Sequence, residues 1–284
     1  MAIVEKFSLM AKGKEARIGI GLGNSKFHNF KILDACAKFL QKFKSKIYAF
    51  GNNTSINQIQ NENLPTHESD IVLIESGKLE QKIFEFLKDN TINSIIRGSL
   101  GSNSFLVNFK SYLNTKKINR LALLETVEGH QFFYGPVGID ECNNVENKIE
   151  FLQFAIKKFG FLGITPIISI LSGGRRSDIG RDTNVDESIK NGDRVVSIMK
   201  KQFPDLKISH DEILIEKAIE NKSNLIIAPD GISGNLIYRT LVHLGGGKAY
   251  GAIYNTKEAI IDTSRVARSS EILGALMLAL ALSN

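Results

Sequence analysis

The sequence predicts a two-domain α/β protein with largely parallel sheets. Short aliphatic runs typical of strands alternate with longer segments of helical apolar periodicity, as 17–22 and 29–43 illustrate. The same alternation resumes after Gly135-Pro136-Val137-Gly138, a cluster of residues that break helices and strands. With 284 residues and 43% hydrophobic content, the chain is long enough for one large core or two modest ones.

The first half alternates strands and helices. In 29–43, Ile32, Cys36, Phe39 and Phe43 recur on one helix face. The other elements predicted here are strands at 17–22, 46–50, 71–75 and 94–97, helices at 79–87 and 104–113, and a hairpin from 121–126 and 131–134. The Asn-rich segment 52–63 is predicted as a surface loop.

The second half follows the same logic. Its predicted helices are 145–159, 185–201, 211–220, 233–244 and 270–282, and its strands are 166–171, 224–228, 249–254 and 259–261. We expect one domain from 1–134 plus 262–284 and another from 135–261, with a cleft between them. Ligands of parallel sheets bind beyond the carboxyl ends of the strands.

Composition narrows the function classes. The net charge of +6 is a mild excess spread along the chain, apart from lysine-rich segments such as Lys38, Lys42, Lys44 and Lys46. We interpret these lysines as a solvated face, so nucleic-acid binding is not expected. Cys36 and Cys142 form neither a disulfide framework nor a metal-binding pattern, so we expect no metal and a reducing, cytoplasmic location. The longest apolar stretch, 272–282, is too short for a membrane span of roughly 20 residues, so no membrane association is expected.

A glycine-rich segment, 19–24, follows the first predicted strand. Its spacing is not GxGxxG, so close packing competes with a dinucleotide-binding role.

A second glycine-rich loop follows strand 166–171 and could bind an anion through backbone N–H groups and guanidinium groups. The candidate residues are Ser172, Gly173, Gly174 and Arg175. Alternatively, Asp178 and Asp182 neutralise the arginines of a surface ion-pair loop.

A third segment, 229–235, joins a predicted strand to a helix. The amides of a helix start favour an anionic ligand, although capping alone would explain Asp230 or Ser233. Capping explains Gly234 and Asn235 less well.

The fourth candidate combines a hydroxyl, a guanidinium and a carboxylate within eight residues, in Ser264, Arg265 and Glu271. A base can deprotonate a nucleophile, while a cation and a hydroxyl stabilise developing negative charge. Alternatively, Glu271 lies at a helix start for dipole reasons and pairs with Arg268.

The order of these motifs resembles the phosphate acetyltransferase and butyryltransferase family. That family has a PDxxxGN motif, a leucine-glycine turn, a glycine-rich strand, an NDLSRG-like loop and an acidic residue that begins the last helix. The matching residues are Pro229, Asp230, Gly234, Asn235, Leu244, Gly245, Gly251, Asp262, Ser264 and Arg265. Within the family, segments 97–101, 136–141 and 172–175 resemble methanogenesis marker proteins of the methyltransferase-associated X type, which implies a methanogenic archaeon as the source.

The resemblance implies an isocitrate/isopropylmalate-dehydrogenase-like fold, a homodimer and an active site in the interdomain cleft. It implies that the carboxylate at the Glu271 position takes the proton from the coenzyme A thiol. It also implies that Ser264 and Arg265 stabilise the acyl phosphate. No tightly bound cofactor is implied, and coenzyme A or its thioester is the expected substrate.

Three positions depart from the family pattern. Glu271 replaces an aspartate, Val266 replaces a glycine, and Asn108 stands where the family carries a phosphate-binding arginine, unless Arg97 or Arg175 substitutes. The sequence therefore indicates a transferase with an altered substrate. The alternative is an accessory subunit of a methyltransferase complex that binds a phosphate-bearing ligand without acyl transfer. A dehydrogenase of similar fold would need a nicotinamide-binding loop, which the sequence lacks.

Overall fold

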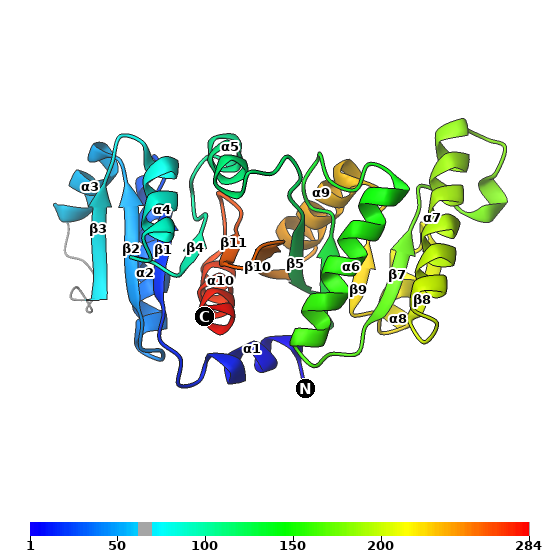
Figure 1. Cartoon of the computed structure of the whole chain (residues 1–284), viewed down its shortest axis with the longest axis horizontal. Coiled ribbons are helices and arrows are strands. Elements are labelled where there is room, and N and C mark those ends of the chain that lie inside the picture. Colours follow the sequence, from blue (N-terminus) through cyan, green and yellow to red (C-terminus); the bar gives the residue numbers. More distant parts are fainter. Residues whose placement is uncertain (62–69, 284) are drawn as a thin grey trace. The chain divides into compact units, whose positions relative to one another are not determined.

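The computed structural model describes residues 1–61 and 70–283 as a mixed α/β protein with mostly parallel strands (Figure 1). The chain divides into two compact units. The first comprises Met1–Ile118 and Ala249–Asn284, and the second comprises Asn119–Lys248. The predicted α/β class with largely parallel strands is confirmed.

The first unit contains a parallel group of strands in the order β3-β2-β1-β4-β11. Their bounds are β1 Arg17–Gly21, β2 Lys46–Gly51, β3 Ile71–Glu75, β4 Ser94–Ile96 and β11 Ala259–Asp262. Strand β10 (Lys248–Tyr254) pairs antiparallel with β11. The parallel strands are predominantly aliphatic, as expected where helices pack on a sheet.

The described helices of this unit are α1 Ile3–Ala11, α2 Lys26–Leu40, α3 Asn53–Gln60, α4 Leu79–Lys88, α5 Ser102–Leu113 and α10 Ser269–Leu282. The apolar helix α10 is buried nearly throughout and packs against α1 and α2. An aromatic cluster that includes Phe84, Phe105, Phe109 and Tyr254 fills the core beside α4 and α5. The last predicted helix is therefore a core helix of this unit.

Helix α3 corrects the prediction of a loop over 52–63. The side chain of Asn52 caps this helix by accepting a hydrogen bond from the Ser55 N–H at 2.9 Å, while Ile56 and Ile59 are buried. The asparagines suggested a loop, but one of them is the cap and two isoleucines supply the buried face. Residues 62 and 63 of that prediction lie outside the described residues.

The second unit has the strand order β5-β6-β9-β7-β8. The bounds are β5 Arg120–Glu125, β6 Gln131–Gly135, β7 Ile167–Leu171, β8 Lys207–Glu212 and β9 Leu225–Ile227. Strands β5 and β6 form the predicted antiparallel hairpin, whereas β6, β9, β7 and β8 run parallel. The helices are α6 Val145–Phe161, α7 Thr183–Gln202, α8 Ile215–Glu220 and α9 Gly231–Arg239, which continues as a π-helical turn over Thr240–Leu244.

Strand β8 corrects the predicted helix at 211–220. The strand continues to Glu212, and α8 begins only at Ile215. Because β8 pairs only with β7 in this unit, it is an edge strand and carries polar residues that hide its strand character in the sequence.

Strand pairing explains where the two units divide. The hairpin β5–β6 belongs to the second unit because β6 pairs with β9, and β11 belongs to the first because it pairs with β4. The division expected from the sequence, 1–134 plus 262–284 and 135–261, instead placed this hairpin in the first domain and 249–261 in the second. Among the described helices, none has the length and apolarity needed to cross a bilayer.

Candidate functional site

The carboxyl ends of β1, β2, β4 and β11 lie at one edge of the first unit's sheet, because these strands are parallel. From β1 the chain builds outward through β2 and β3, then returns to place β4 on the other side of β1. Such a reversal of strand order is the usual ligand-binding position in parallel sheets. The loops after β1, β4 and β11 are therefore the structural candidates for a site.

A small hollow lies at this edge. It is formed by the first half of α2, the turn after β4, the loop after β11 and the start of α10. Its lining residues are His28, Ile32, Gly98, Thr263, Ser264, Arg265, Ala267 and Ile272. Two predicted catalytic residues, Ser264 and Arg265, thus line one hollow, together with a histidine.

Glu271 anchors the loop that carries these two residues. Its side chain is only 3% exposed, in the first turn of α10, and its Oε1 accepts a hydrogen bond from the Ser264 N–H at 2.7 Å. The carboxylate therefore satisfies a loop amide and also lies at the helix N-terminus, where negative charge is favourable. The three predicted catalytic residues meet, with Glu271 beneath the loop.

Arg265 and Val266 form the exposed tip of this loop. Within the described part of the chain, the Arg265 guanidinium has no hydrogen bond or ion pair, which leaves its donors available to a ligand. The hydroxyl of half-buried Ser264 accepts a long hydrogen bond of 3.3 Å from the Val266 N–H. The tip therefore offers a cation and a hydroxyl to the hollow.

Arg97, predicted to bind an anion, is instead committed to the protein. The side chain is buried, its Nε pairs with Asp262, and its Nη2 donates to the Thr263 carbonyl. Its Nη1 donates to the carbonyl of Leu100 at 2.7 Å. The guanidinium thus joins the turn after β4 to the loop after β11, and we reassign Arg97 to positioning that loop.

Close packing accounts for the glycines of segment 19–24. A Cβ on Gly21 would lie 2.6 Å from the Arg97 carbonyl oxygen and closer still to Leu100. The Gly23 N–H donates to the Ser99 hydroxyl at 2.7 Å. These contacts favour the packing interpretation over a dinucleotide loop.

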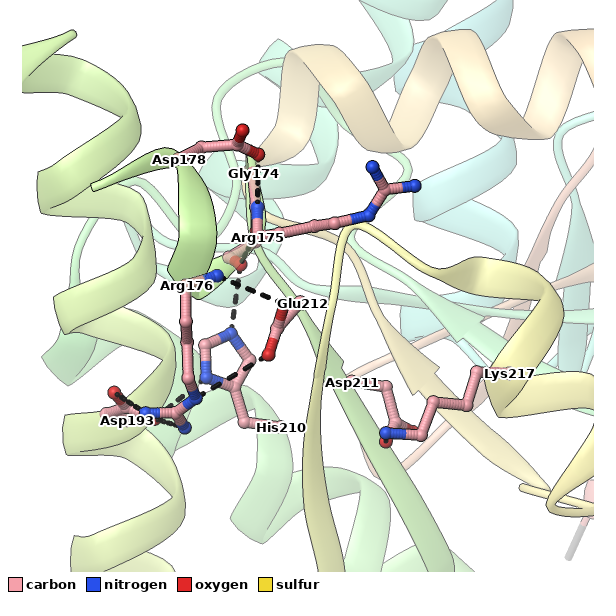
Figure 2. A network of polar contacts seen from close by, with 10 residues as sticks. Gly174, Arg175, Arg176, Asp178, Asp193, His210, Asp211, Glu212 and Lys217 are labelled. Atoms are coloured by element: carbon pink, nitrogen blue, oxygen red, sulfur yellow. Dashed lines mark hydrogen bonds and ion pairs between the residues drawn. The ribbon is translucent and has the colours of Figure 1, made fainter. Parts of the chain in front are cut away.

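In the second unit, the predicted anion-binding loop after β7 is held by a polar network (Figure 2). Ser172 is 1% exposed, and its hydroxyl lies 2.9 Å from Nε2 of His210 and 3.0 Å from the Gly174 carbonyl oxygen. Nδ1 of His210 lies 2.8 Å from Asp193. The Gly173 N–H is taken by the hydroxyl of Ser188 at 2.9 Å.

The order Ser172, His210, Asp193 has the residue types and spacings of a nucleophilic triad. Burial argues against that chemistry, because a nucleophile must reach its substrate. The Gly174 carbonyl oxygen also accepts the hydroxyl proton of Ser172. The geometry therefore makes this group a device that holds the loop.

Ion pairs complete the network. Arg176 forms two bonds to Asp193, at 2.6 and 3.1 Å, and Figure 2 shows Arg175 extending away from this cluster. Partial burial would raise the pKa of Asp193, but hydrogen bonds from His210 and Arg176 outweigh it and lower that pKa. The loop is thus an ion-pair loop, but only Asp178, which pairs with Arg181, plays the part expected from the sequence, because Arg176 pairs with Asp193 and Glu212 and Asp182 caps α7. Arg175 is the predicted anion-binding residue whose side chain remains exposed.

The predicted site residues of 229–235 make structural contacts within the second unit. Asp230 caps α9 by accepting from the N–H groups of Ile232 and Ser233, at 2.9 and 2.8 Å. Asn235 donates to the Val137 carbonyl at 2.8 Å, and a Cβ on Gly234 would lie 2.1 Å from a backbone oxygen. Capping and close packing thus explain all four residues without a ligand.

Asn108 and the two cysteines do not extend the candidate site. Asn108, half-buried on α5, donates to the Ser104 carbonyl. Burial raises the pKa of Cys36 to about 12 and raises that of Cys142 as well, so neither thiol is a ready nucleophile. Over the described ranges, no cluster of three or more His, Cys, Asp or Glu side chains could hold a metal ion.

The sequence analysis missed His28 and the pair His210–Asp193. His28 follows a helix cap by only a few residues and carries no motif, so only the tertiary structure brings it to the hollow. His210 lies on the unrecognised strand β8. The one available signal was Gly192, a glycine in the middle of a helix, where a Cβ would lie 2.6 Å from the His210 ring.

Solved structures define the class of the fold. A branched-chain phosphotransacylase from Enterococcus faecalis superposes with a TM-score of 0.70 at 16% identity, covering 94% of this chain and 98% of that chain. A phosphotransacetylase from Streptococcus pyogenes gives a TM-score of 0.69 at 15% identity, with coverage of 99% and 98%. The protein therefore has the phosphotransacylase-like fold.

Sequence relatives identify the family within that class. No protein-family model matches the chain. A Methanosarcina mazei protein with the provisional name methyltransferase mtx subunit X is 34% identical over 284 residues, covering 100% of this chain and 96% of its own length. The chain belongs to this methyltransferase mtx subunit X family, as the resemblance in its sequence indicated.

Proposed function

We propose that this protein is a transferase that acts on a small anionic substrate beside the 263–268 loop, related in chemistry to the phosphate acyltransferases but with an altered substrate. The observation that carries the proposal is the pairing of the buried Glu271 carboxylate with the Ser264 N–H, which holds exposed Arg265 at the hollow. Arg265 and Ser264 bind the anionic group and stabilise the developing negative charge. Proton acceptance is assigned to Glu271 by the family resemblance, and because its carboxylate is buried beneath the loop, this role requires the loop to shift when substrate binds.

In the direction from acyl phosphate, the coenzyme A thiol gives its proton to Glu271 and its sulfur bonds to the acyl carbon. The C–O bond to phosphate breaks, and phosphate leaves on Arg265. The phosphotransacylase-like fold supports this assignment. We further propose that the fold is of the isocitrate/isopropylmalate-dehydrogenase-like kind. Arg175, with its exposed side chain, is a second candidate for binding the substrate's charge.

A coenzyme A release assay tests this function. Purified protein is given phosphate and a panel of acyl coenzyme A thioesters, and free thiol is measured. We expect turnover that is lost in Arg265→Ala. The matched control is Arg239→Ala, which removes an exposed arginine at the end of α9 and should keep full activity. Tight binding without turnover across the panel would contradict acyl transfer.

The relatives' name supports a second candidate function, an accessory subunit of a methyltransferase complex in a methanogenic archaeon. The similarity to a protein named as a subunit extends over the whole chain. In this case the site holds a phosphate-bearing ligand without acyl transfer. The test is size-exclusion chromatography with purified methyltransferase subunits from the same organism, where co-elution without coenzyme A release is expected. Separate elution would reject this candidate.

A further inference from the structure

The ring of His210 in the second unit has a hydrogen-bond partner at each of its two nitrogens (Figure 2). The side chain is only 3% exposed, on β8. Nδ1 lies 2.8 Å from Oδ1 of Asp193 on α7, and Nε2 lies 2.9 Å from the hydroxyl oxygen of Ser172 after β7. The chemistry of these two partners decides where the protons of the ring are.

Asp193 requires a proton on Nδ1. Its carboxylate accepts two hydrogen bonds from the guanidinium of Arg176, at 2.6 and 3.1 Å. Although partial burial would raise the pKa of Asp193, the bonds from His210 and Arg176 hold that pKa below its ordinary value. An ionised carboxylate accepts hydrogen bonds and donates none. Nδ1 is therefore the donor to Asp193.

Ser172 requires a proton on Nε2 as well. Its hydroxyl has a single proton and lies 3.0 Å from the carbonyl oxygen of Gly174. A carbonyl oxygen can only accept, so the hydroxyl donates to it, and the hydroxyl oxygen is left to accept from Nε2. In this arrangement every polar atom from Asp193 to Gly174 is paired. The ring of His210 is then an imidazolium cation.

The charges around the ring favour this cation. They come from α7 in Asp193, from the loop in Arg176 and from the end of β8 in Glu212. Arg176 contacts both acids, with Nη2 at 2.6 Å from Asp193 and Nε at 3.5 Å from Glu212. Two carboxylates that share one guanidinium leave one negative charge, and a charged His210 ring balances it.

Loss of one proton breaks this chain of hydrogen bonds at the loop. When Nε2 is unprotonated it becomes an acceptor, so the single hydroxyl proton of Ser172 turns toward it. The carbonyl of Gly174, a buried residue, then loses its donor, which is unfavourable. Arg175 follows directly in the chain, and its exposed side chain extends away from the cluster (Figure 2).

We propose that His210 is a pH-sensitive latch of the 172–178 loop. Its doubly protonated ring holds the Gly174 carbonyl through the Ser172 hydroxyl and so fixes the position of Arg175, whereas loss of the Nε2 proton at higher pH releases the carbonyl. His210 is thus a positioning residue. The inference does not rest on the proposed function, because the latch concerns this loop whatever Arg175 binds.

NMR of the full chain can follow both ends of the latch. Labelling histidine with ¹⁵N reports the protonation of each ring nitrogen among the five histidines, and His210→Asn assigns the His210 signals. The sequence contains only two Gly-Arg pairs, Gly174-Arg175 and Gly180-Arg181. Glycine labelled with ¹³C at the carbonyl, combined with ¹⁵N-labelled arginine, therefore selects two carbonyl signals, and Arg181→Lys identifies the second.

We expect a pH titration to remove the proton from Nε2 of His210 while Nδ1 keeps its proton. The Gly174 carbonyl signal should move with the same midpoint pH, because it loses its hydrogen bond in the same step. The Gly180 carbonyl is the internal control and should not follow this midpoint. A proton lost first from Nδ1, or a Gly174 signal that does not follow the His210 ring, would overturn the inference.

Two serine variants test the connection. Ser172→Ala removes the hydroxyl between the ring and Gly174, so the ring should still titrate while the Gly174 signal no longer follows it. Ser188→Ala is the matched control, since its hydroxyl accepts from the Gly173 N–H at 2.9 Å in the same loop and should leave the coupling intact. Persistent coupling in a folded Ser172→Ala protein would contradict the latch, and the wild-type titration decides the question if that variant fails to fold.

Discussion

The carboxylate of Glu271 lies 2.7 Å from the backbone nitrogen of Ser264, so a buried side chain at the start of α10 holds the loop that presents Arg265. The two interpretations of Glu271, a helix-start acid or a site residue, are therefore compatible. The same group lies at the N-terminus of α10 and organises the loop. If the loop binds the proposed anion, we expect a change at Glu271 to alter both stability and ligand binding.

Replacing Glu271 should loosen the loop. Glu271→Ala leaves the Ser264 N–H without its charged acceptor and should lower the free energy of unfolding by about 1.5–3 kcal/mol, measured by urea denaturation. Glu271→Gln keeps an acceptor oxygen and should cost less. Glu146→Ala is the control, an exposed first-turn acid of α6 whose loss should cost about 0.3–1 kcal/mol. Equal losses for the two alanine variants would argue against the anchoring role.

Breaking the buried pair between Arg97 and Asp262 should be strongly destabilising. Removing one partner leaves an uncompensated buried charge, so Arg97→Ala should cost about 3–5 kcal/mol in urea denaturation. Lys38→Ala, which breaks an exposed pair with Asp34 on α2, should cost only about 0.3–0.5 kcal/mol. A cost under about 1 kcal/mol for Arg97→Ala would show that the guanidinium does not hold the loops together.

Gly192→Ala tests whether the His210 network needs the space that this glycine leaves. Alanine forms helices better by about 1 kcal/mol, but its Cβ would lie 2.6 Å from the His210 ring, so overpacking should give a net loss of about 1–2 kcal/mol. Gly160→Ala in α6 meets no atom within 4 Å and should stabilise the protein. Thermal unfolding of both variants measures the contrast. Stabilisation by Gly192→Ala would mean that His210 moves away at little cost.

Lys148 provides a prediction with a defined pH dependence. Burial lowers the pKa of this α6 lysine, although the nearby Cys142 and Asp230 act in the opposite direction. Between the lowered pKa and the ordinary 10.5, the unfolded chain binds more protons than the folded one, so the stability of the wild type rises with pH in that window.

Lys148→Met removes the cost of burying this charged side chain and should raise the free energy of unfolding at pH 7 by about 1–2 kcal/mol. The advantage over wild type should narrow as the pH rises through the window, as measured by urea denaturation at a series of pH values. Lys200→Met changes an exposed lysine of α7 and should show no such trend. An advantage that widens with pH would contradict the direction of the shift.

Elements with strong local patterns were predictable. The strands near Ile18, Ile47 and Ile95 and the helix that begins at Ser269 are apolar runs of the right length, and they occur where expected. Strand β8 and helix α3 were not, because one is a polar edge strand and the other begins with an asparagine cap in an Asn-rich segment. Local composition misleads where burial depends on a distant partner.

The sequence by itself determined the α/β class and the family, and it predicted the trio Ser264, Arg265 and Glu271, because these depend on order and spacing along the chain. Only the tertiary structure decided that Arg97 is committed to Asp262 and that His28 shares a hollow with Arg265. Both relationships join segments far apart in the sequence. Whether a charged side chain binds a ligand or the protein depends on which groups folding brings within hydrogen-bond distance.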